Sequence, residues 1–380
     1  MKRSHHCNQL REDNAGSPAT LIGWIDSLRD HGGVFFLDLR DREGKTQVVL
    51  DPENQTLSEL FPKLKPESVI EVKGEVRNRD EGTENSNLAT GDIELFASSI
   101  IVHNQSKTPP FPMDDSADKV GEDLRLTYRY LDLRRESNLN TLKLRHRASM
   151  AIREFFDKQD FLEIETPMLF KSTPEGAREF LVPSRMNEGK FYALPQSPQQ
   201  YKQMLMVAGI ERYYQLARCF RDEDLRADRQ PEFTQLDIET SFLSEEQIMQ
   251  TMETMIRALF KEVMDVDLPD PFPRMTWQES VDRFGIDRPD LRIPLELVEV
   301  GDLLKDADFK VFSGPANDPE GRVAALKVPG GSKISRKQID EYTAFVARYG
   351  ARGLAWVKCN DVAAGRDGLQ APILKFLTDE

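Results

Sequence analysis

Hydrophobic and polar residues alternate in five short runs over the first hundred positions, a pattern typical of β-strands that are buried on one face. Turn-forming residues separate the runs, which cover residues 20–25, 34–39, 46–50, 69–76 and 93–102. A helical pattern at residues 55–61 falls between the third and fourth runs. We therefore expect a small all-β domain that contains one helix.

This order of elements, five strands with a helix after the third, is that of an OB-fold barrel. The face made by strands 2 and 3 of such barrels often binds single-stranded nucleic acid. On that face the alternation would present Phe36 and Gln47. Most phenylalanines in strands are buried, so composition alone favours Phe36 as a core residue. Both interpretations of Phe36 stay open at this point.

The remaining chain shows a different pattern. Prolines at 109, 110 and 112 indicate a hinge. Helical periodicity predicts a buried helix at 139–159 that leads into a strand at 161–166, and a second helix at 245–263 with a capping box of Ser244 and Gln247. A third helix is expected at 336–349 and a strand at 354–358. We place the domains at 1–106, 123–286 and 287–380, with the hinge at 107–122.

Composition places the chain among globular proteins, because 39% of its 380 residues are hydrophobic and 31% are charged. The sequence contains no apolar run of about 20 residues, the length that a membrane span needs, and its start lacks the apolar segment of a signal peptide. We therefore expect a cytoplasmic protein without membrane contact. The net charge of −14 argues against indiscriminate nucleic-acid binding and leaves a local patch possible. We interpret His5-His6-Cys7 as a frayed terminus rather than a metal site.

The most informative stretch is 211–242, where two strand-like runs flank a charged loop. The pattern predicts an antiparallel hairpin with a long loop. On its returning strand Gln235, Asp237 and Glu239 share one face, while Leu236 and Ile238 share the other. A polar face of this kind is most often exposed to solvent.

The loop itself favours a nucleotide site. Arg221 ends the outgoing strand, and the loop holds three arginines together with acids, a mixture that binds a nucleotide triphosphate with its magnesium. Phe233 could stack on a base. The chain has neither a GxxxxGK[ST] loop nor a GxGxxG loop, so we expect an ATP site on an antiparallel sheet.

Several segments resemble class II aminoacyl-tRNA synthetases. Residues 161–169 resemble their motif 1, and residues 214–239, with the core FRDEDLRADRQPEFTQLD, resemble motif 2. STPEGAR at 172–178 and QSPQQYK at 196–202 resemble substrate-binding segments of the bacterial aspartyl enzymes. The resemblance implies an α+β fold: the OB-fold barrel, a catalytic core on an antiparallel sheet, and the first part of an inserted α+β domain.

The resemblance implies a role for each matching residue. Glu175 and Asp237 would bind the ammonium of aspartate, while Gln199 and Lys202 would line its pocket, with Lys202 near the side-chain carboxylate. Arg221 would bind both the α-phosphate and the substrate carboxylate. The positions expected to contact ATP are Arg221, Asp222, Glu223, Gln230, Phe233 and Glu239, with Arg221 and Glu223 as catalytic residues.

The implied reaction is the activation of L-aspartate by ATP, with Mg²⁺, followed by transfer to tRNA(Asp). It needs no covalent nucleophile, so Cys219 is expected to be structural. The resemblance implies that Phe36, Gln47 and Glu94 recognise bases of the tRNA anticodon. His31 and Gly82 are typical of members that also charge tRNA(Asn). Motif 1 implies a homodimer that uses residues 139–167.

The resemblance is incomplete at the C-terminal end. Motif 3 of the class, with its arginine for the γ-phosphate, does not follow residue 242, and the chain stops within the inserted domain. We therefore expect a truncated copy that is inactive alone. Two alternatives stay open: an asparaginyl or lysyl enzyme, against which the loop at 176–178 and Lys202 both argue, and a non-catalytic tRNA-binding protein.

Overall fold

The computed structural model describes residues 2–173 and 175–377, with Asp115 described by its backbone alone. The chain divides into two compact units, Met1–Pro269 and Asp270–Glu380, and each is described by itself. Within the described residues, no helix has both the length and the apolar character that crossing a membrane requires. The domain boundaries expected from the sequence stay predictions.

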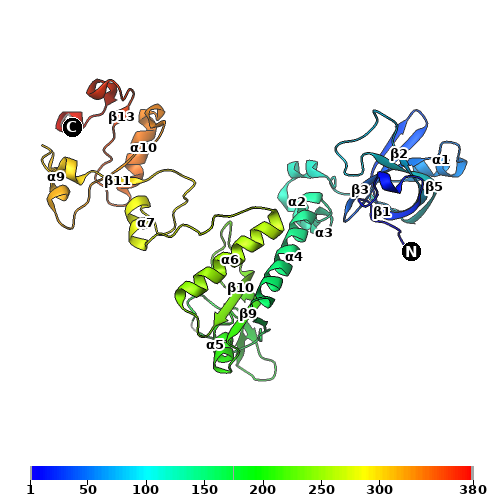
Figure 1. Cartoon of the computed structure of the whole chain (residues 1–380), viewed down its shortest axis with the longest axis horizontal. Helices are drawn as coiled ribbons and strands as arrows, with labels where there is room; N and C mark the ends of the chain where they lie inside the picture. The colour runs from blue at the N-terminus through cyan, green and yellow to red at the C-terminus, as the bar shows by residue number, and fades with distance from the viewer. Residues whose placement is uncertain (1, 174, 378–380) are drawn as a thin grey trace. The chain divides into compact units, whose positions relative to one another are not determined.

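The first hundred residues form the expected five-stranded closed barrel, drawn in blue in Figure 1. Its strands are β1 (Pro18–His31), β2 (Val34–Asp41), β3 (Gly44–Leu50), β4 (Val69–Asn78) and β5 (Ile93–Asn104). They close in the order β1-β2-β3-β5-β4, with β3 and β5 parallel. Helix α1 (Gln55–Leu60) lies between β3 and β4, as predicted.

The barrel interior is filled by alternate side chains from all five strands, because successive residues of a strand point to opposite faces. Leu37, Leu39 and Val48 are fully buried there, and each buried aliphatic side chain contributes about 1.5 to 3 kcal/mol. Two residues from before the first strand, Cys7 and Leu10, join the same core.

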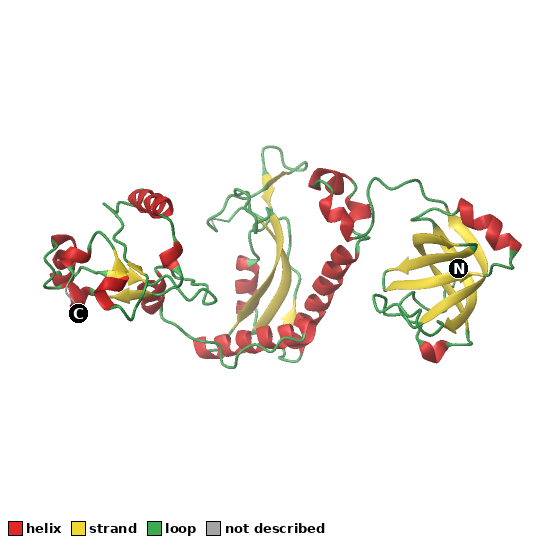
Figure 2. Cartoon of the chain, turned by 90° about the horizontal axis from the view of Figure 1, so that it is seen from above, coloured by secondary structure: helices red, strands yellow, loops and turns green. Residues whose placement is uncertain are grey.

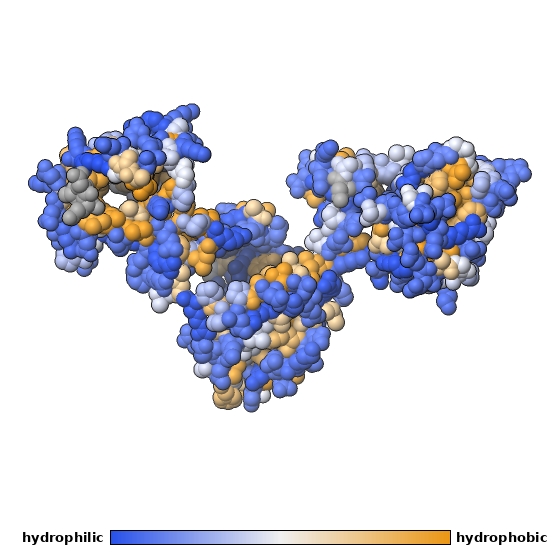
Figure 3. All heavy atoms as spheres, turned by 45° about the horizontal axis from the view of Figure 1, so that its top comes forward, coloured by the Kyte–Doolittle hydropathy of each residue, from blue (hydrophilic) through white to orange (hydrophobic). Residues whose placement is uncertain are grey.

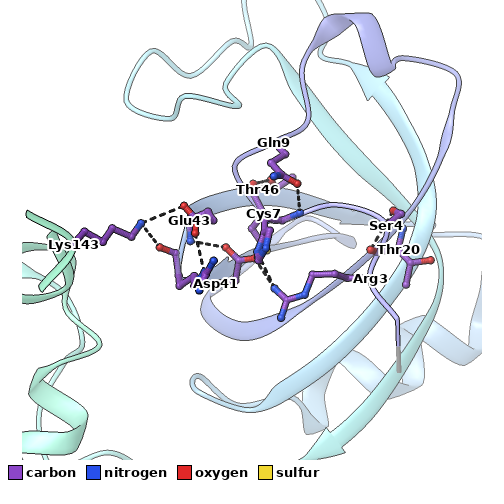
Figure 4. A network of polar contacts seen from close by, with 11 residues as sticks. Arg3, Ser4, Cys7, Gln9, Thr20, Asp41, Glu43, Thr46 and Lys143 are labelled. Carbon is purple, nitrogen blue, oxygen red and sulfur yellow. Dashed lines mark hydrogen bonds and ion pairs between the residues drawn. The ribbon is translucent and has the colours of Figure 1, made fainter. Parts of the chain in front are cut away.

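The N-terminal segment is therefore anchored, and the prediction of a frayed terminus is wrong. The Asp41 carboxylate accepts hydrogen bonds from Arg3 Nη1 (2.8 Å), His6 Nδ1 (2.7 Å) and the Cys7 amide (3.1 Å), as Figure 4 shows in part. Thr46 Oγ1 donates to the Cys7 carbonyl. Cys7 is buried in the core, and the hydrogen bonds on either side of it hold the segment against the barrel. The polar residues of this segment gave no sign of that burial.

The proline-rich stretch at 108–112 forms neither helix nor strand, as expected. It is still packed, because Phe111, Met113 and Ala117 form a small buried cluster that Tyr128 and Leu131 complete. Short helices α2 (Glu122–Thr127) and α3 (Arg129–Asp132) follow. The hinge interpretation stays a prediction.

The central sheet of the first unit has the order β10-β9-β6, from β6 (Leu162–Glu163), β9 (Arg212–Phe220) and β10 (Glu232–Thr240). Strands β9 and β10 form the predicted antiparallel hairpin, whereas β6 pairs with β9 in parallel at the sheet edge. Helices α4 (Glu136–Asp157) and α6 (Glu245–Met264) lie beside this sheet in Figure 2. The capping box of Ser244 and Gln247 at α6 is confirmed.

One face of this sheet is the core of the unit. Phe156, Phe161, Tyr214 and Met255 are buried together there, and Met252 packs against them, so the methionines of α6 are core residues as predicted. Three further elements complete the unit: α5 (Gln199–Val207), β7 (Leu181–Pro183) and β8 (Phe191–Ala193).

The predicted buried helix is only half buried. Its C-terminal part carries the buried Ala151 and Phe156, whereas Leu142, Leu144 and Met150 are exposed. Figure 3 shows hydrophobic atoms on the surface in this part of the unit. Helical spacing of apolar residues indicates a face that is covered, but it does not tell whether the same chain covers it.

The second unit contains short elements: α7 (Trp277–Phe284), α8 (Gly301–Leu304), α9 (Lys310–Asn317), α10 (Arg336–Ala347), and the strand pairs β11 (Leu297–Glu299) with β12 (Ala324–Leu326) and β13 (Lys358–Cys359) with β14 (Leu369–Gln370). The expected helix at 336–349 is present as α10. The expected strand at 354–358 is wrong except at Lys358, because β14 provides ladder partners only for residues 358 and 359.

Candidate functional site

The hairpin of β9 and β10 has one apolar and one polar face, as predicted. Leu236 and Ile238 pack on the buried cluster, while Asp237 lies opposite Gln215 and Glu239 opposite Tyr213 on the other face. That face is not simply solvent-exposed, since Asp237 is only 4% exposed. A buried carboxylate needs compensating partners, and these define the site.

Lys202 is the main partner of this carboxylate. Its ammonium lies 2.6 Å from Asp237 Oδ1 and 3.4 Å from Glu239 Oε2, with its side chain 12% exposed. Gln235 Nε2 also donates to Asp237. One ammonium between two carboxylates leaves a net charge of −1, so this cluster attracts a further cation such as an amino-acid ammonium.

The helix α5 brings this lysine into place. It begins directly after Pro198, and Gln199 and Lys202 are three residues apart and so lie on one side of the helix. Gln199 is half-buried at its first turn. The structure thus brings Lys202, Asp237 and Glu239 together and places Gln199 one turn away.

The loop around Glu175 lies beside the start of α5. Ser197 Oγ donates to Glu175 Oε2 (3.0 Å), and Thr173 Oγ1 donates to Oε1 (3.3 Å). The Pro174 of the predicted segment lies outside the described residues. These two hydroxyl groups orient the Glu175 carboxylate.

Gln196 holds this loop in place, a role that the sequence pattern does not signal. Its Oε1 accepts from the Ala177 amide (3.0 Å), and its Nε2 donates to the Ala177 carbonyl (2.9 Å). The side chain is 3% exposed. Its amide satisfies the backbone N–H and C=O of Ala177, as a neighbouring strand would. The only hint in the sequence is that Gln196 lies within the segment resembling a substrate-binding one.

The charged loop between β9 and β10 is exposed throughout residues 221–230, which includes Arg221, Asp222, Glu223 and Gln230. Its base is tied down, because the Arg221 amide donates to the Pro231 carbonyl (2.8 Å) and the Asp222 amide to the Arg178 carbonyl (3.0 Å). The Arg221 guanidinium lies over the half-buried Phe233 ring, 5.2 Å from its centroid.

The ionisation of the Cys219 thiol depends on the charged groups of the site. The pKa of Cys219 is raised to about 11, mainly by burial and also by the carboxylates of Asp237 and Glu175, while Arg221 and Lys202 act in the opposite direction. Four charged groups from four segments therefore influence the ionisation of this thiol. Fully buried and protonated at neutral pH, Cys219 fits the predicted structural role.

A metal ion is not held by these side chains alone. Among residues 2–173 and 175–377, no three His, Cys, Asp or Glu side chains form a group suited to a metal. Asp237 and Glu239 are both engaged by Lys202. These described side chains therefore form no cage of three protein donors, whereas Mg²⁺ commonly uses one or two carboxylates together with substrate phosphates.

A second polar cluster covers the outer face of the barrel. Arg29 makes two bonds of 2.9 Å to the Asp38 carboxylate, and its Nη2 also donates to Gln47 Oε1 (3.2 Å). Gln47 Nε2 donates to Glu94 Oε2 (3.1 Å). Burial raises the pKa of Glu94. The predicted pair Gln47 and Glu94 is thus brought together.

Arg29 and Asp38 were missed by the sequence analysis. The first strand was expected to end at residue 25, but β1 continues to His31, so Arg29 lies opposite Phe36. The available signal was weak: the polar residues at 27, 29 and 31 share one face of an extended strand, but only Leu28 on the other face is apolar.

Phe36 does not belong to the barrel core. It is half-buried and lies outside the core cluster, whereas its neighbour Phe35 packs against that cluster and stacks on Phe61 with 4.3 Å between ring centroids. The exposed His31 contacts the Phe36 ring edge-on at 5.6 Å. Gly82 is exposed in the turn between β4 and β5, with φ at +84°.

Two models of known families match this chain. Residues 19–102 match the family model of the OB-fold nucleic acid binding domain, and residues 121–363 match that of tRNA synthetases class II (D, K and N). The chain belongs to the class II tRNA synthetases of the D, K and N type. The expected fold class, an OB-fold barrel followed by a class II core, is confirmed.

Solved structures of such synthetases share this fold. An asparaginyl-tRNA synthetase from Pyrococcus horikoshii, complexed with asparaginyl-adenylate, is 24% identical with a TM-score of 0.62, over 70% of this chain and 59% of its own. A putative aspartyl-tRNA synthetase from Leishmania major Friedlin is 24% identical with a TM-score of 0.61, over 70% and 54%. The aspartyl tRNA synthetase from Entamoeba histolytica is 23% identical with a TM-score of 0.60, over 74% and 62%.

The class II chain described here thus spans between 54% and 62% of these three synthetases. Both aspartyl and asparaginyl enzymes occur among them, so this likeness shows the fold and does not separate the two amino acids.

Proposed function

We propose that this class II synthetase chain carries the L-aspartate and ATP sites for the formation of aspartyl-adenylate, from which the aspartyl group is transferred to tRNA(Asp). The observation that carries the proposal is the largely buried Lys202 ammonium between Asp237 and Glu239, in the first turn of a helix that begins two residues after Ser197, the donor to Glu175. This cluster offers a cation and carboxylates within one small space, which suits an amino acid with an acidic side chain.

Each end of the substrate has a partner in this arrangement. The ammonium of aspartate binds Asp237 and Glu175, and its side-chain carboxylate binds Lys202, with Gln199 lining the pocket. The cluster has a net negative charge before the substrate arrives, which favours binding of the substrate ammonium. Arg221 receives the α-carboxylate and the α-phosphate.

ATP binds along the exposed loop. The adenine stacks on Phe233, and Asp222, Glu223, Gln230 and Glu239 surround the nucleotide. Mg²⁺ would be held mainly by the phosphates of ATP and would neutralise their charge, with Glu239 as a nearby carboxylate. Adenine binding at Phe233 releases Arg221 from the ring that it now covers, which frees its guanidinium for the α-phosphate.

The reaction follows from this positioning. The α-carboxylate attacks the α-phosphorus in line, pyrophosphate leaves, and the 3′-hydroxyl of the tRNA then takes the aspartyl group. Holding the two reactants in line contributes up to about 7 to 11 kcal/mol to such a step, and Arg221 and Glu223 stabilise the charge that develops.

The barrel selects the tRNA in this proposal. Phe36 stacks an anticodon base, and Gln47 and Glu94 read base edges, since their amide and carboxylate are already oriented by Arg29 and by each other. His31 and Gly82 extend the choice to tRNA(Asn). The exposed Leu142, Leu144 and Met150 of α4 support a homodimer, because a second copy would cover them.

Calorimetric titration with non-hydrolysable sulfamoyl analogues of aspartyl-adenylate and asparaginyl-adenylate tests the amino acid. The proposal predicts at least tenfold tighter binding of the aspartyl analogue. Tighter binding of the asparaginyl analogue would overturn the assignment to aspartate.

Asparagine is the second candidate, because Asp237 and Glu239 already balance the charge of Lys202 and a neutral amide would meet no uncompensated cation. The same titration separates the two amino acids. If the chain binds tRNA but neither analogue, the barrel acts as a tRNA-binding module without amino-acid activation.

A further inference from the structure

The outer face of the barrel carries a second aromatic residue besides Phe36. In the strand register Phe36 of β2 lies opposite Val49 of β3, and Val49 lies beside Phe96 of β5. All three lie outside the barrel core cluster, whereas their neighbours Leu95 and Ala97 are inside it. Phe36 and Phe96 therefore lie on the same outer face.

Val49 lies between the two phenylalanine residues in the strand register. It belongs to this outer row, yet it is only 6% exposed. Neighbouring strands are about 4.8 Å apart, so the two phenylalanines, two strands apart, are separated by roughly 10 Å. Both rings are half-buried.

Each ring has an arginine beside it. Arg29 lies opposite Phe36 and is held by Asp38. Arg77 of β4 lies over the Phe96 ring, with its guanidinium carbon 3.6 Å from the ring centroid and its side chain 45% exposed. A guanidinium stacked this closely on a ring presents its other face outward, and such planes stack unpaired RNA bases.

We propose that Arg77 and Phe96 form a second base-stacking site for the same single-stranded RNA loop that Phe36 binds. An unpaired base lies on the Arg77 guanidinium, which Phe96 supports from below. Directly stacked bases are about 3.4 Å apart, so sites roughly 10 Å apart take two bases that are splayed from each other. The Gln47 and Glu94 pair lies in the adjacent row, where it can read base edges between them.

This inference rests on the proposed function, in which the barrel binds the anticodon loop. The test uses the full chain and an RNA hairpin with the sequence of the tRNA(Asp) anticodon arm, with affinity measured by fluorescence anisotropy at fixed salt. The variants are Phe96→Leu, Arg77→Gln and Arg77→Lys, and Phe36→Leu is the reference for the first site. Thermal unfolding shows that each variant is folded, which is expected because Phe96 lies outside the core.

Loss of one stacked base lowers affinity about tenfold. We expect this loss for Phe96→Leu and for both Arg77 variants, because lysine keeps the charge but lacks the planar group. The charge-matched control is Lys65→Gln, which removes an exposed cation outside the outer row and is expected to change affinity less than about twofold.

Abasic substitutions along the RNA loop locate the bases. The unmodified chain should lose affinity at two loop positions, and Phe96→Leu should become insensitive at one of them, while Phe36→Leu becomes insensitive at the other. If both variants lose sensitivity at the same position, there is no second site.

Three other outcomes contradict the inference in different ways. Unchanged affinity of Phe96→Leu, together with a loss for Phe36→Leu, overturns the second site and leaves the proposed function standing. Full affinity of Arg77→Lys shows a phosphate contact in place of base stacking. No binding of the hairpin by the unmodified chain overturns both the second site and the proposed role of the barrel.

Discussion

The outer face of the barrel and the polar face of the hairpin are built in different ways. On the barrel, Arg29, Asp38, Gln47 and Glu94 come from neighbouring strands of one closed sheet and are already joined by hydrogen bonds. On the hairpin, Lys202, Glu175 and Asp237 come from a helix, a loop and a strand, and the adjoining loop at 221–230 is exposed. The barrel face is thus set by the strand register, whereas the hairpin face depends on contacts between distant segments.

This difference predicts how each face responds to change. A substitution on the barrel face should affect RNA binding alone, because its partners lie in the same sheet. A substitution at the hairpin face should affect several segments at once, because each charged group is balanced by groups from other elements.

The largest effect is expected for Asp237→Asn, which removes the main partner of Lys202 without changing the size of the side chain. Affinity for the aspartyl-adenylate analogue should fall by about 30-fold or more, the loss typical of a broken buried charge pair. Calorimetric titration of both proteins with the analogue measures this loss of affinity.

The matched control is Asp38→Asn, which breaks a carboxylate pair with Arg29 on the barrel. It should weaken binding of the anticodon-arm hairpin and leave analogue binding unchanged. If Asp38→Asn also lowers analogue affinity, the two faces are not independent.

Gln196→Met tests whether a single side chain holds the Glu175 loop. The variant loses both bonds to Ala177, each of which contributes about 0.5 to 1.5 kcal/mol. Hydrogen exchange of the peptide that contains Ala177 should become about tenfold faster, while β9 peptides keep their protection. Gln203→Met, at an exposed position of α5, should leave the exchange of both peptides unchanged. Equal acceleration in both variants would contradict the role of Gln196.

The third prediction concerns Asp41, which anchors the N-terminal segment to the barrel. Burial opposes its ionisation, but the amides of Glu43 and Cys7 and the His6 side chain outweigh this and lower the pKa of Asp41. A lowered pKa stabilises the folded state above the unfolded pKa of about 3.9, and this stabilisation is lost as the pH falls through the folded value.

Asp41→Asn should therefore lower the free energy of unfolding by about 1 to 2 kcal/mol at pH 7. In urea unfolding series at decreasing pH, the difference from the unmodified chain should shrink only below about pH 4. Asp13→Asn, an exposed change, should have no measurable effect at any pH. A difference that stays constant down to pH 2 would show that the Asp41 charge does not stabilise the segment.

The last prediction, with the smallest expected effect, compares the reactivity of two cysteines in the unmodified chain. Cys219 is buried and the pKa of its thiol is raised to about 11, whereas Cys359 is exposed. Iodoacetamide at pH 7.5 should label Cys359 within minutes and leave Cys219 unmodified until urea is added, as peptide mass spectrometry would show. Rapid labelling of native Cys219 would mean that the hairpin face is open to solvent.

Much of the barrel could be predicted from the sequence, because each strand is a local pattern of alternation and each turn has its own residues. The N-terminal segment could not, since burial of Cys7 depends on Asp41 and Thr46, more than 30 positions away. Arg29 was missed because alternation fades where both faces of β1 become half-exposed.

At the candidate site, the alternation along β10 correctly assigned Asp237 and Glu239 to one face. The ion pair with Lys202 could not be derived from spacing, because the two residues are 35 positions apart on different elements. Gln196 carries no local signal, since a glutamine that bonds a backbone amide and carbonyl looks like any other glutamine in the sequence. The resemblance to the family assigned Lys202 and Asp237 to one substrate pocket, but it gave neither their ion pair nor the contacts of Gln196.

The proposed selection of aspartate by Lys202 is tested most directly by comparing two dissociation constants in two proteins. The ratio of affinities for the aspartyl and asparaginyl analogues is measured by calorimetry for the unmodified chain and for Lys202→Met. We predict that the ratio favours aspartyl at least tenfold in the unmodified chain and falls to about one in the variant. A ratio that Lys202→Met leaves unchanged would contradict the assignment of this lysine as the group that selects the substrate.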